Sequence, residues 1–306
     1  MKSKIIYFLL FVCSFSYAQN NIVSEEILIT NDSIQLPGTL SYSNSKSPLI
    51  IWVHGSGNVD RNGNQGTIIK ANYIKQFRDS INKHNIAFFS YDKRSATKRN
   101  FALSKNMKFN GFVSDLKQVI NHLKKNKRFS EIILIGHSQG SLTAMLSTKD
   151  VDKYISIAGP SKSIDKTILE QINKQSPAII PFVEKHFKEL KATGEIKKVN
   201  PLLMSIFAPQ NQNFLASWMQ YNPAAEIKKL TIPVLIINGT KDIQVKIEDA
   251  KALHKALPTS KLTLIDNMNH VLKKIEKEAD NMNSYYSPNF QLSKELITTI
   301  VDFLKN

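Results

Sequence analysis

Strand-like and helix-like stretches alternate along most of the chain. Apolar runs bounded by proline, glycine or polar turn residues predict buried strands, and apolar positions three or four residues apart predict helices that pack on them. The expected strands are Ile22–Thr30, Ile34–Tyr42, Leu49–Val53, Ile86–Tyr91, Glu131–Ile135, Tyr154–Ala158, Val234–Asn238 and Lys261–Ile265. The expected helices are Thr67–His84, Phe109–Lys125, Ser138–Ser147, Ile247–Leu257 and Ser293–Leu304. This alternation predicts an α/β fold: a mostly parallel sheet with helices on both faces and an antiparallel pair of strands at its start.

The segment between residues 161 and 223 breaks the alternation. It contains helical stretches and no buried-strand run, and the strand pattern restarts after Pro233. Four prolines interrupt the helical stretches: Pro177, Pro181, Pro201 and Pro209. We therefore expect one sheet domain made of residues 19–160 and 224–306, with residues 161–223 inserted as a helical cap. Because the last strand and helix would complete the same sheet, two separately folding halves are not expected.

Residues 1–18 have the layout of a secretory signal peptide. Lys2 and Lys4 precede the short apolar run Ile5–Val12, and Ser16-Tyr17-Ala18 offers small residues at a cleavage site. This order of regions is typical of signal peptides. We expect cleavage after Ala18 and export to the periplasm or the medium. Loss of the two lysines would lower the formal net charge from +16 to +14.

Two other roles for this N-terminal segment are weaker. The apolar run is shorter than the roughly 20 residues that span a bilayer, so a retained membrane anchor is disfavoured. A lipoprotein would use Cys13 as its lipid acceptor, and the branched Val12 before it does not suit such a site. Cys13 is also the only cysteine of the sequence. A cleaved chain would therefore have no disulfide, no thiolate nucleophile and no cysteine metal site.

Basic residues are spread along the whole chain, which has 41 Lys and Arg against 25 Asp and Glu. The densest run, Lys124–Arg128, ends an expected helix, where cations interact favourably with the helix dipole. No nucleic-acid-binding motif accompanies it. We expect no nucleic-acid partner and no stable membrane insertion after signal cleavage. Loose attraction to anionic surfaces stays open, as does the oligomeric state.

The strongest chemical signal is Gly136-His137-Ser138-Gln139-Gly140. This GxSxG sequence lies between an expected strand and an expected helix, which is the context of a nucleophile elbow. In such an elbow the serine occupies a strained turn, and flanking glycines avoid backbone clashes. The N-terminus of the following helix stabilises negative charge there. The pattern predicts Ser138 as a nucleophile, and the alternative is a glycine-rich turn with an inactive serine.

A serine hydroxyl needs a general base at neutral pH. In this arrangement the serine comes first in the sequence, then the acid, then the histidine. Asp242 and His270 follow the expected strands Val234–Asn238 and Lys261–Ile265. Both therefore lie where the carboxyl ends of neighbouring strands meet. We predict His270 as the general base and Asp242 as the acid that orients it, with Asp266 as the rival acid.

Other histidines fit the role of base less well. His54 and His137 precede the acid in the sequence, and His84 and His122 fall on expected helices, where we expect surface groups. The alternative for His270 is a solvated loop histidine. The two remaining histidines are His186 and His254.

Backbone N–H groups are expected to bind the negatively charged oxygen of the tetrahedral intermediate. One is the amide of Gln139, directly after Ser138. The other is expected in His54-Gly55-Ser56-Gly57, with the Ser56 amide preferred and Gly55 next. The alternative is a plain glycine-rich strand exit. Because position 60 is not glycine, the segment is not a dinucleotide-binding motif.

Charged residues near this loop form two expected pairs. We expect Asp60 and Arg61 to hold the loop by pairing with Arg94 and Asp92, because both sets lie just beyond strands that are expected to be adjacent. The alternative is solvated loop charges.

Aromatic residues of the expected cap have two possible roles. They would either line an acyl pocket or pack the cap on the core, and packing is favoured for most of them. They are Phe182, Phe187, Phe207, Phe214 and Trp218.

Four segments carry a resemblance to a known superfamily: His54-Gly55-Ser56-Gly57, Asp60-Arg61-Asn62-Gly63-Asn64, Tyr91-Asp92-Lys93-Arg94 and the GHSQG elbow. They resemble the α/β-hydrolase superfamily, particularly bacterial esterases near the dienelactone-hydrolase and acyl-aminoacyl-peptidase-like branch. The match runs from about Glu26 to Leu304 and is weakest in the cap. The resemblance implies a carboxylic ester hydrolase without metal or organic cofactor, with the family's catalytic serine, acid and histidine at Ser138, Asp242 and His270. Ser95 departs from the branch, which usually has glycine there.

Three functions are compatible with these residues. The preferred one is a serine esterase acting on a small-molecule ester with a small or medium acyl group. A serine peptidase or amidase would use the same triad, but no β-propeller-like repeat precedes the domain. A non-catalytic binding protein of hydrolase descent is disfavoured by the complete triad. The sequence has no HExxH motif and no Cys/His spacing typical of a metal site.

Overall fold

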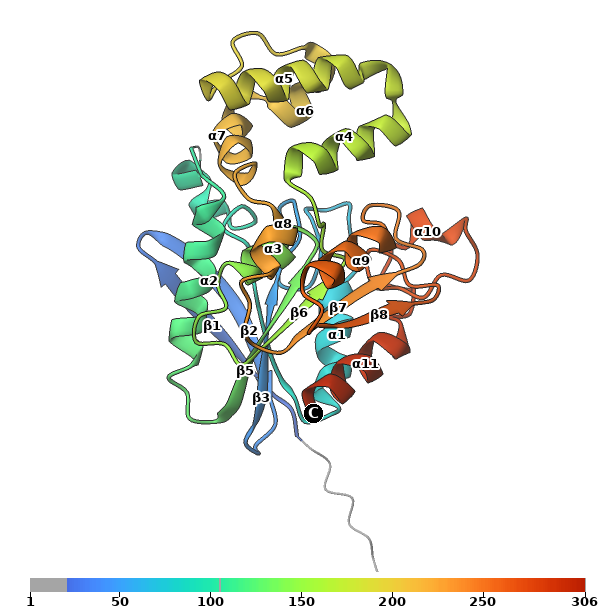
Figure 1. Cartoon of the computed structure of the whole chain (residues 1–306). Helices are drawn as coiled ribbons and strands as arrows, with labels where there is room; N and C mark the ends of the chain where they lie inside the picture. Colours follow the sequence, from blue (N-terminus) through green and yellow to red (C-terminus); the bar gives the residue numbers. More distant parts are fainter. Residues whose placement is uncertain (1–20, 105, 306) are drawn as a thin grey trace, which may run out of the picture.

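An eight-stranded sheet forms the centre of the protein (Figure 1). The computed structural model describes residues 21–104 and 106–305, so the expected signal peptide, residues 1–18, lies outside the described residues. The strand order across the sheet is β1-β2-β4-β3-β5-β6-β7-β8. The strands are β1 (Val23–Asn31), β2 (Ile34–Tyr42), β3 (Ser47–Val53), β4 (Ala87–Tyr91), β5 (Phe129–His137), β6 (Lys153–Ile157), β7 (Val234–Gly239) and β8 (Lys261–Ile265).

The pairing of the strands confirms the predicted mixture. β1 pairs with β2 in antiparallel orientation around a tight turn in which Asp32 has a φ of 52°. β2 is antiparallel to β4, and every later pairing is parallel. The parallel strands therefore end at the same edge of the sheet, where the loops that follow β3, β5, β7 and β8 meet.

Helices cover both faces of the sheet (Figure 1). Alternate residues of β3 point to opposite faces: Leu49 and Ile51 into one apolar layer, Ile50 and Trp52 into the other. The first layer packs under α2 (Asn110–Leu123), α3 (Gln139–Met145), α8 (Pro223–Ile227) and α9 (Ile247–Ala256), and the second packs under α1 (Tyr73–Asn82) and α11 (Lys294–Lys305). This arrangement confirms the predicted α/β-hydrolase fold.

The first helix is shorter than the pattern predicts. The expected span Thr67–His84 contains α1 (Tyr73–Asn82), whereas the other expected strands and helices agree with the structure to within two residues at each end. Gln65 and Ile69 exchange backbone hydrogen bonds before α1, and Asn72 has a φ of 48°, which a helix cannot contain. The apolar residues in this segment therefore belong to a loop.

Four helices between β6 and β7 lie over the carboxyl ends of the strands (Figure 1). Pro181 and Pro209 fall in the first turns of two of them, where the missing N–H costs no hydrogen bond. They are α4 (Ile164–Gln175), α5 (Ile180–Thr193), α6 (Met204–Phe207) and α7 (Pro209–Trp218). We call α4 to α7 the cap helices. The shorter elements are the 3₁₀ helices η1 (Lys98–Asn100), η2 (Ala102–Ser104), η3 (Pro177–Ile179) and η4 (Pro201–Leu203), and α10 (Asp280–Asn283).

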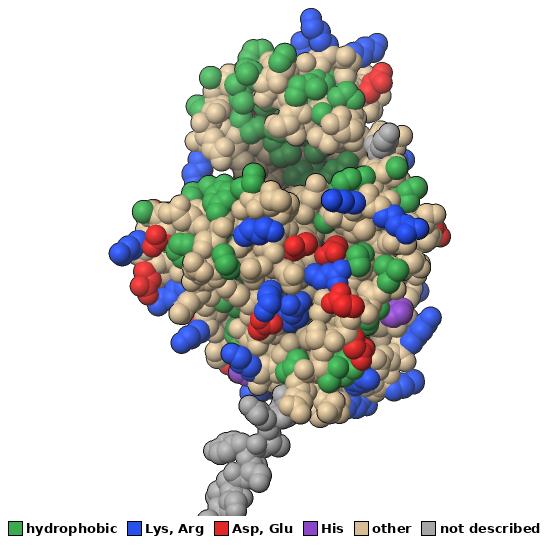
Figure 2. Space-filling view, turned by 180° about the vertical axis from the view of Figure 1, so that it is seen from behind, with side chains coloured by type: hydrophobic (Ala, Val, Ile, Leu, Met, Phe, Trp, Pro, Cys, Tyr) green, Lys and Arg blue, Asp and Glu red, His purple; other side chains and the backbone are tan. Residues whose placement is uncertain are grey.

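The surface carries charges of both signs. On the face shown in Figure 2, lysine and arginine side chains are interspersed with acidic ones below the cap. Within residues 21–104 and 106–305, no helix combines the length and the apolar character that crossing a bilayer requires.

Candidate active site

Ser138 occupies the turn between β5 and α3, as the elbow pattern predicts. Its backbone has a φ of 54° and a ψ of −122°, a strained conformation for a residue with a side chain. The turn fits only because two neighbours are glycine. A Cβ at Gly140 would lie 2.1 Å from the Val53 carbonyl oxygen, and one at Gly136 would lie 2.6 Å from the Gly140 carbonyl oxygen. The end of β3 therefore packs directly against the Ser138 turn.

Asp242 and His270 form a direct pair at the carboxyl edge of the sheet. The Nδ1 of His270 donates to Oδ2 of Asp242 at 2.7 Å. The other carboxylate oxygen accepts the backbone N–H groups of Gln244 at 2.8 Å and Val245 at 2.9 Å. This arrangement fixes the carboxylate and leaves Nε2 of His270 free of the proton in the neutral ring. The rival acid, Asp266, is exposed.

His137 connects the serine turn to the histidine loop. Its Nε2 donates to the carbonyl oxygen of His270 at 2.8 Å, and its Nδ1 accepts from the Tyr73 hydroxyl at 3.5 Å. The ring lies 4.8 Å from the His270 ring, measured between centroids. Burial, followed by the charge of His270, lowers the pKa of His137 from 6.5 to about 3. His137 is therefore a neutral structural group at physiological pH.

The three predicted residues meet at one edge of the sheet without one continuous hydrogen-bonded chain. The Asp242–His270 contact is formed, and Ser138 directly follows His137, which holds the His270 backbone. Within the described part of the chain, the Ser138 hydroxyl makes no hydrogen bond to His270. Contacts of this kind often tighten only when a substrate binds.

The predicted oxyanion donors line a common cavity. Ser56 and Gln139 both face a cavity of about 590 Å³ between the loop after β3 and the cap helices. Neither amide donates to another group within the described residues. Gly55 belongs to this loop and lies against the elbow, since a Cβ there would be 3.1 Å from the Ser138 Cβ. The two amides are therefore free to bind a negatively charged oxygen.

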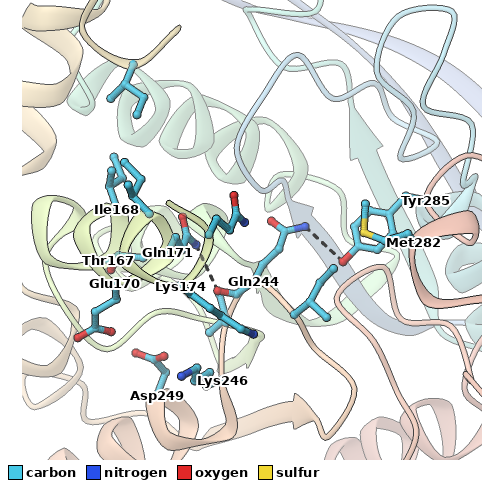
Figure 3. Close-up of a pocket in the computed structure, with 15 residues that line it drawn as sticks. Thr167, Ile168, Glu170, Gln171, Lys174, Gln244, Lys246, Asp249, Met282 and Tyr285 are labelled. Carbon is cyan, nitrogen blue, oxygen red and sulfur yellow. Dashed lines mark hydrogen bonds between the residues drawn. The ribbon is translucent and has the colours of Figure 1, made fainter. Parts of the chain in front are cut away.

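Two large cavities lie under the cap helices, and Figure 2 shows the apolar hollow between cap and sheet. The second cavity has a volume of about 600 Å³ and lies between α4 and the loop after β7 (Figure 3). Gln171 and Gln244 line it, and the Gln244 side chain contacts the Tyr285 hydroxyl at 3.3 Å. Ile168 and Ile206 line both cavities. A much smaller space lies at Ser138.

The cap aromatics divide between the two expected roles. Phe214 and Trp218 line the 590 Å³ cavity beside Gln139. Phe187 and Phe207 are buried against each other, with ring centroids 4.8 Å apart. Phe182 is exposed at the surface. Packing is thus the role of the second pair, and only the first pair faces the candidate site.

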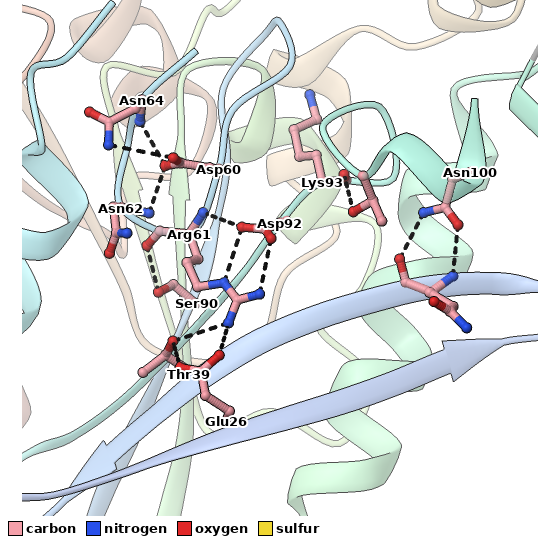
Figure 4. A network of polar contacts seen from close by, with 12 residues as sticks. Glu26, Thr39, Asp60, Arg61, Asn62, Asn64, Ser90, Asp92, Lys93 and Asn100 are labelled. Carbon is pink, nitrogen blue, oxygen red and sulfur yellow. Dashed lines mark hydrogen bonds and ion pairs between the residues drawn. The ribbon is translucent and has the colours of Figure 1, made fainter. Parts of the chain in front are cut away.

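One of the two expected charge pairs is present. Arg61 donates to Asp92 through Nη2 at 3.0 Å and Nε at 3.1 Å, and it also pairs with Glu26 (Figure 4). The prediction of an Asp60–Arg94 ion pair is wrong. Asp60 instead accepts the backbone N–H groups of Asn62 and Asn64, each at 2.9 Å, which closes its own turn (Figure 4).

Arg94 has a different partner from the one expected. It pairs with the buried Asp115 of α2, with Nη2 and Nε each 2.6 Å from a carboxylate oxygen. The bidentate geometry ties the loop after β4 to α2.

Two residues around the site are not identified by the sequence pattern. His137 occupies the variable position of GxSxG, to which the motif assigns no role. Its hydrogen-bond partner, the His270 carbonyl oxygen, lies 133 positions away in the sequence. Lys93 was visible only within the Tyr91-Asp92-Lys93-Arg94 segment. Its ammonium group is buried and contacts both Gly55 and Gln139. Of the other histidines, His84 and His122 are exposed, whereas His54 is buried with its ring against Tyr91.

The fold and the arrangement at the elbow define the class of protein: it is an α/β hydrolase. A sequence profile of the BD-FAE family matches residues 34–257, and the chain belongs to this family. The resemblance to α/β-hydrolase esterases noted in the sequence is thereby confirmed.

Three esterases are similar to this chain in sequence or structure. Esterase EstD of Thermotoga maritima is 25% identical over 281 residues, which cover 88% of this chain and 65% of EstD. The chain thus spans less than two thirds of that relative. Est1E of Butyrivibrio proteoclasticus, in a structure with bound ferulic acid, has a TM-score of 0.58 at 19% identity, covering 92% of this chain and 100% of Est1E. Esterase Pf2001 of Pyrococcus furiosus has a TM-score of 0.58 at 18% identity, covering 93% of this chain and 90% of Pf2001.

Acid should destabilise the protein through His137. The folded protein holds the pKa of His137 at about 3, against 6.5 for a free histidine, so between these values the unfolded chain binds a proton that the folded chain does not. The free energy of unfolding should therefore fall as pH drops from 6.5, by up to about 1.4 kcal/mol per pH unit. In His137→Gln this contribution should be missing.

The measurement is urea unfolding of wild type and His137→Gln at pH 7, 6, 5 and 4.5. The stability difference between the two should shrink as pH falls. His122→Gln, at an exposed position, should follow the wild type at every pH. A constant gap between wild type and His137→Gln would contradict the neutral, buried assignment.

Proposed function

We propose that the protein is a serine hydrolase that cleaves carboxylic esters through Ser138, His270 and Asp242. The observation that carries the proposal is the 2.7 Å contact from His270 Nδ1 to Asp242, formed at the same sheet edge as the strained Ser138 turn. A histidine oriented in this way presents Nε2 as a base. Membership in the BD-FAE family and the named esterase relatives support the same reaction class.

In the proposed first half-reaction, Ser138 Oγ attacks the ester carbonyl carbon while His270 Nε2 takes the hydroxyl proton. The tetrahedral intermediate collapses when its C–O bond breaks, and His270 returns the proton to the leaving alcohol. In the second half-reaction a water molecule attacks the acyl-enzyme, His270 again accepts and donates one proton, and Ser138 is regenerated. Asp242 stabilises the protonated imidazole in both halves.

The proposed oxyanion donors are the amides of Ser56 and Gln139. Gln139 is the first residue of α3, so its amide has no partner within the helix. An oxyanion at this position would also face the positive end of the helix dipole. Donors of this kind are fixed in place before the charge develops, which is why they contribute strongly to rate.

The cavities under the cap helices suggest where the substrate lies. The leaving alcohol must be near His270, because that residue protonates it. The cavity lined by Gln244 and Val245, whose backbone N–H groups hold Asp242, suits this part of the substrate. The cavity lined by Phe214, Trp218 and Gln139 suits a small or medium acyl group. A serine peptidase would use the same triad, but no observation on this chain favours amide cleavage.

We also propose that the protein is exported and that its signal peptide, residues 1–18, is removed. The support is the sequence of that segment: two lysines, a short apolar run and small residues before Gln19.

Removing any member of the proposed triad should nearly abolish ester hydrolysis. Ser138→Ala and His270→Ala should lower kcat by at least about 10³-fold, and Asp242→Asn by about 10² to 10⁴-fold. The double variant of Ser138 and His270 should be little worse than Ser138→Ala alone, because the residues act as a unit. The measurement is a panel of p-nitrophenyl esters of increasing acyl length, with matching p-nitroanilides.

Matched controls are Ser33→Ala, in the exposed β1–β2 turn, and His122→Ala, on the exposed side of α2. Both should retain wild-type rates. Near-normal ester hydrolysis by folded Ser138→Ala would refute the mechanism, and faster cleavage of the anilides than of the esters would favour the peptidase alternative.

Export should be visible in the mass of the protein isolated from its native host. Protein purified from its native host should have the intact mass of a chain that begins at Gln19, because cleavage follows Ala18. An uncleaved chain, or a lipid-modified chain beginning at Cys13, would contradict the proposed cleavage.

A further inference from the structure

Lys93 is a buried lysine that the proposed mechanism does not use. It follows β4 and is only 5% exposed. Its Nζ donates to the carbonyl oxygen of Gly55 at 2.8 Å and to Oε1 of Gln139 at 2.9 Å. Burying an ammonium group is costly unless it is well hydrogen-bonded. Both acceptors belong to the two segments that supply the proposed oxyanion donors.

The contact with Gly55 controls the direction of the Ser56 amide. The Gly55 carbonyl and the Ser56 N–H belong to one planar, trans peptide group, in which they point in opposite directions. A donor fixed on the carbonyl side therefore aims the N–H toward the opposite side. A hydrogen bond at the oxygen also polarises the group, which makes its N–H a stronger donor.

The contact with Gln139 fixes the other segment. The Gln139 side chain is 4% exposed, and its amide oxygen accepts from Lys93. The backbone N–H of the same residue is the second proposed oxyanion donor. One ammonium group thus spans the loop after β3 and the start of α3.

We propose that Lys93 is a positioning residue that holds the Ser56 and Gln139 amides at the separation needed to bind the oxyanion. The inference rests on the proposed function, since it requires a tetrahedral intermediate on Ser138. Lys93 also lines the 590 Å³ cavity, and the role proposed for it is exerted through the two amides.

The role depends on hydrogen bonding rather than on charge. A neutral amine retains two N–H bonds, which equals the number of acceptors that Lys93 contacts. Its remaining side faces the Phe112 ring, whose centroid lies 4.2 Å from Nζ. Burial lowers the pKa of Lys93 to about 7, so the neutral form is already abundant at mildly alkaline pH. The titratable groups around the amine are His54, Tyr91, Arg94 and Asp115.

These neighbours do not offer Lys93 a free countercharge. Asp115 is paired with Arg94. Burial and the charge of Lys93 hold the pKa of His54 well below its usual range, so that ring is neutral. The polar partners of Lys93 are therefore the Gly55 carbonyl oxygen and the Gln139 side-chain oxygen.

The test replaces Lys93 with methionine, which is similar in length but has no donor. Rates are expressed per active serine, counted by stoichiometric titration with a fluorophosphonate. Lys93→Met should lower kcat for p-nitrophenyl acetate by about 10 to 100-fold and change KM by less than about 3-fold, because the donors act on the transition state. Lys124→Met, at an exposed end of α2, should match the wild type.

A second readout separates positioning from a general structural effect. A trifluoromethyl ketone forms a tetrahedral, negatively charged adduct with an active serine, so its affinity should fall in Lys93→Met by the same factor as kcat/KM. The inference would be overturned if Lys93→Met lowered only the number of titratable serines. In that case kcat per active serine and the affinity for the ketone would both stay at their wild-type values.

The pH dependence separates hydrogen bonding from charge. The ratio of wild-type kcat to Lys93→Met kcat should stay constant from pH 6 to 9, across the ionisation of Lys93. A wild-type rate that falls with that ionisation, while the variant rate does not, would assign the effect to the charge and overturn the positioning role.

Gln139→Met provides an independent test should Lys93→Met fold poorly. It removes the Oε1 acceptor and keeps the backbone amide, so kcat should fall about 3 to 10-fold. The double variant should be no slower than Lys93→Met, because both substitutions remove the same hydrogen bond between Lys93 and Gln139. Wild-type rates in Gln139→Met, or strictly multiplicative losses in the double variant, would overturn the inference. Failure of the proposed function is distinguishable: wild-type protein would then not titrate at Ser138.

Discussion

The close approach of β3 to the Ser138 turn is the constraint on which the candidate site depends. The Val53 carbonyl lies where a side chain at Gly140 would begin, so the elbow can form only with glycine there. The same approach brings the loop after β3 next to Ser138 and places its amides beside the Gln139 amide. A positive φ at Ser138 is retained because the surrounding contacts determine it. Backbone packing, before any side-chain chemistry, thus creates the geometry of the site.

Buried polar groups then hold the loops at this edge in register. His137 ties the elbow to the His270 loop through a backbone carbonyl, and Lys93 ties the elbow to the loop after β3. Asp242 is fixed by two backbone amides before it contacts His270. His137, Asp242 and Lys93 each contact at least one backbone group, which restricts a loop more than a contact between two flexible side chains would; Lys93 also contacts the Gln139 side chain. The groups proposed to react can therefore lie on loops and still be held closely in place.

Much of the fold was predictable, because the parallel strands are continuous apolar runs bounded by turn residues. The elbow and the order of Ser138, Asp242 and His270 were also visible, since each follows such a run. Pairings between distant charges were predictable only in part: the Arg61–Asp92 pair is present and the Asp60–Arg94 pair is not. Arg94 contacts Asp115 rather than Asp60, and nothing local in the sequence distinguishes the two carboxylates. The apolar residues of the loop before α1 have helical spacing, so the pattern predicts a helix there. The left-handed backbone conformation of Asn72, which ends the loop, leaves no signal in that pattern.

Every step proposed for this site requires Ser138 to be an activated nucleophile. The most direct measurement is labelling of the folded protein with a fluorophosphonate probe, followed by mass mapping of the labelled peptide. An activated serine attacks this electrophile, whereas an ordinary hydroxyl does not. We predict one label per chain, on the peptide that contains Ser138, which is lost in Ser138→Ala and retained in Ser33→Ala. A label on any other residue, or catalytically active protein that takes up no label, would contradict the account.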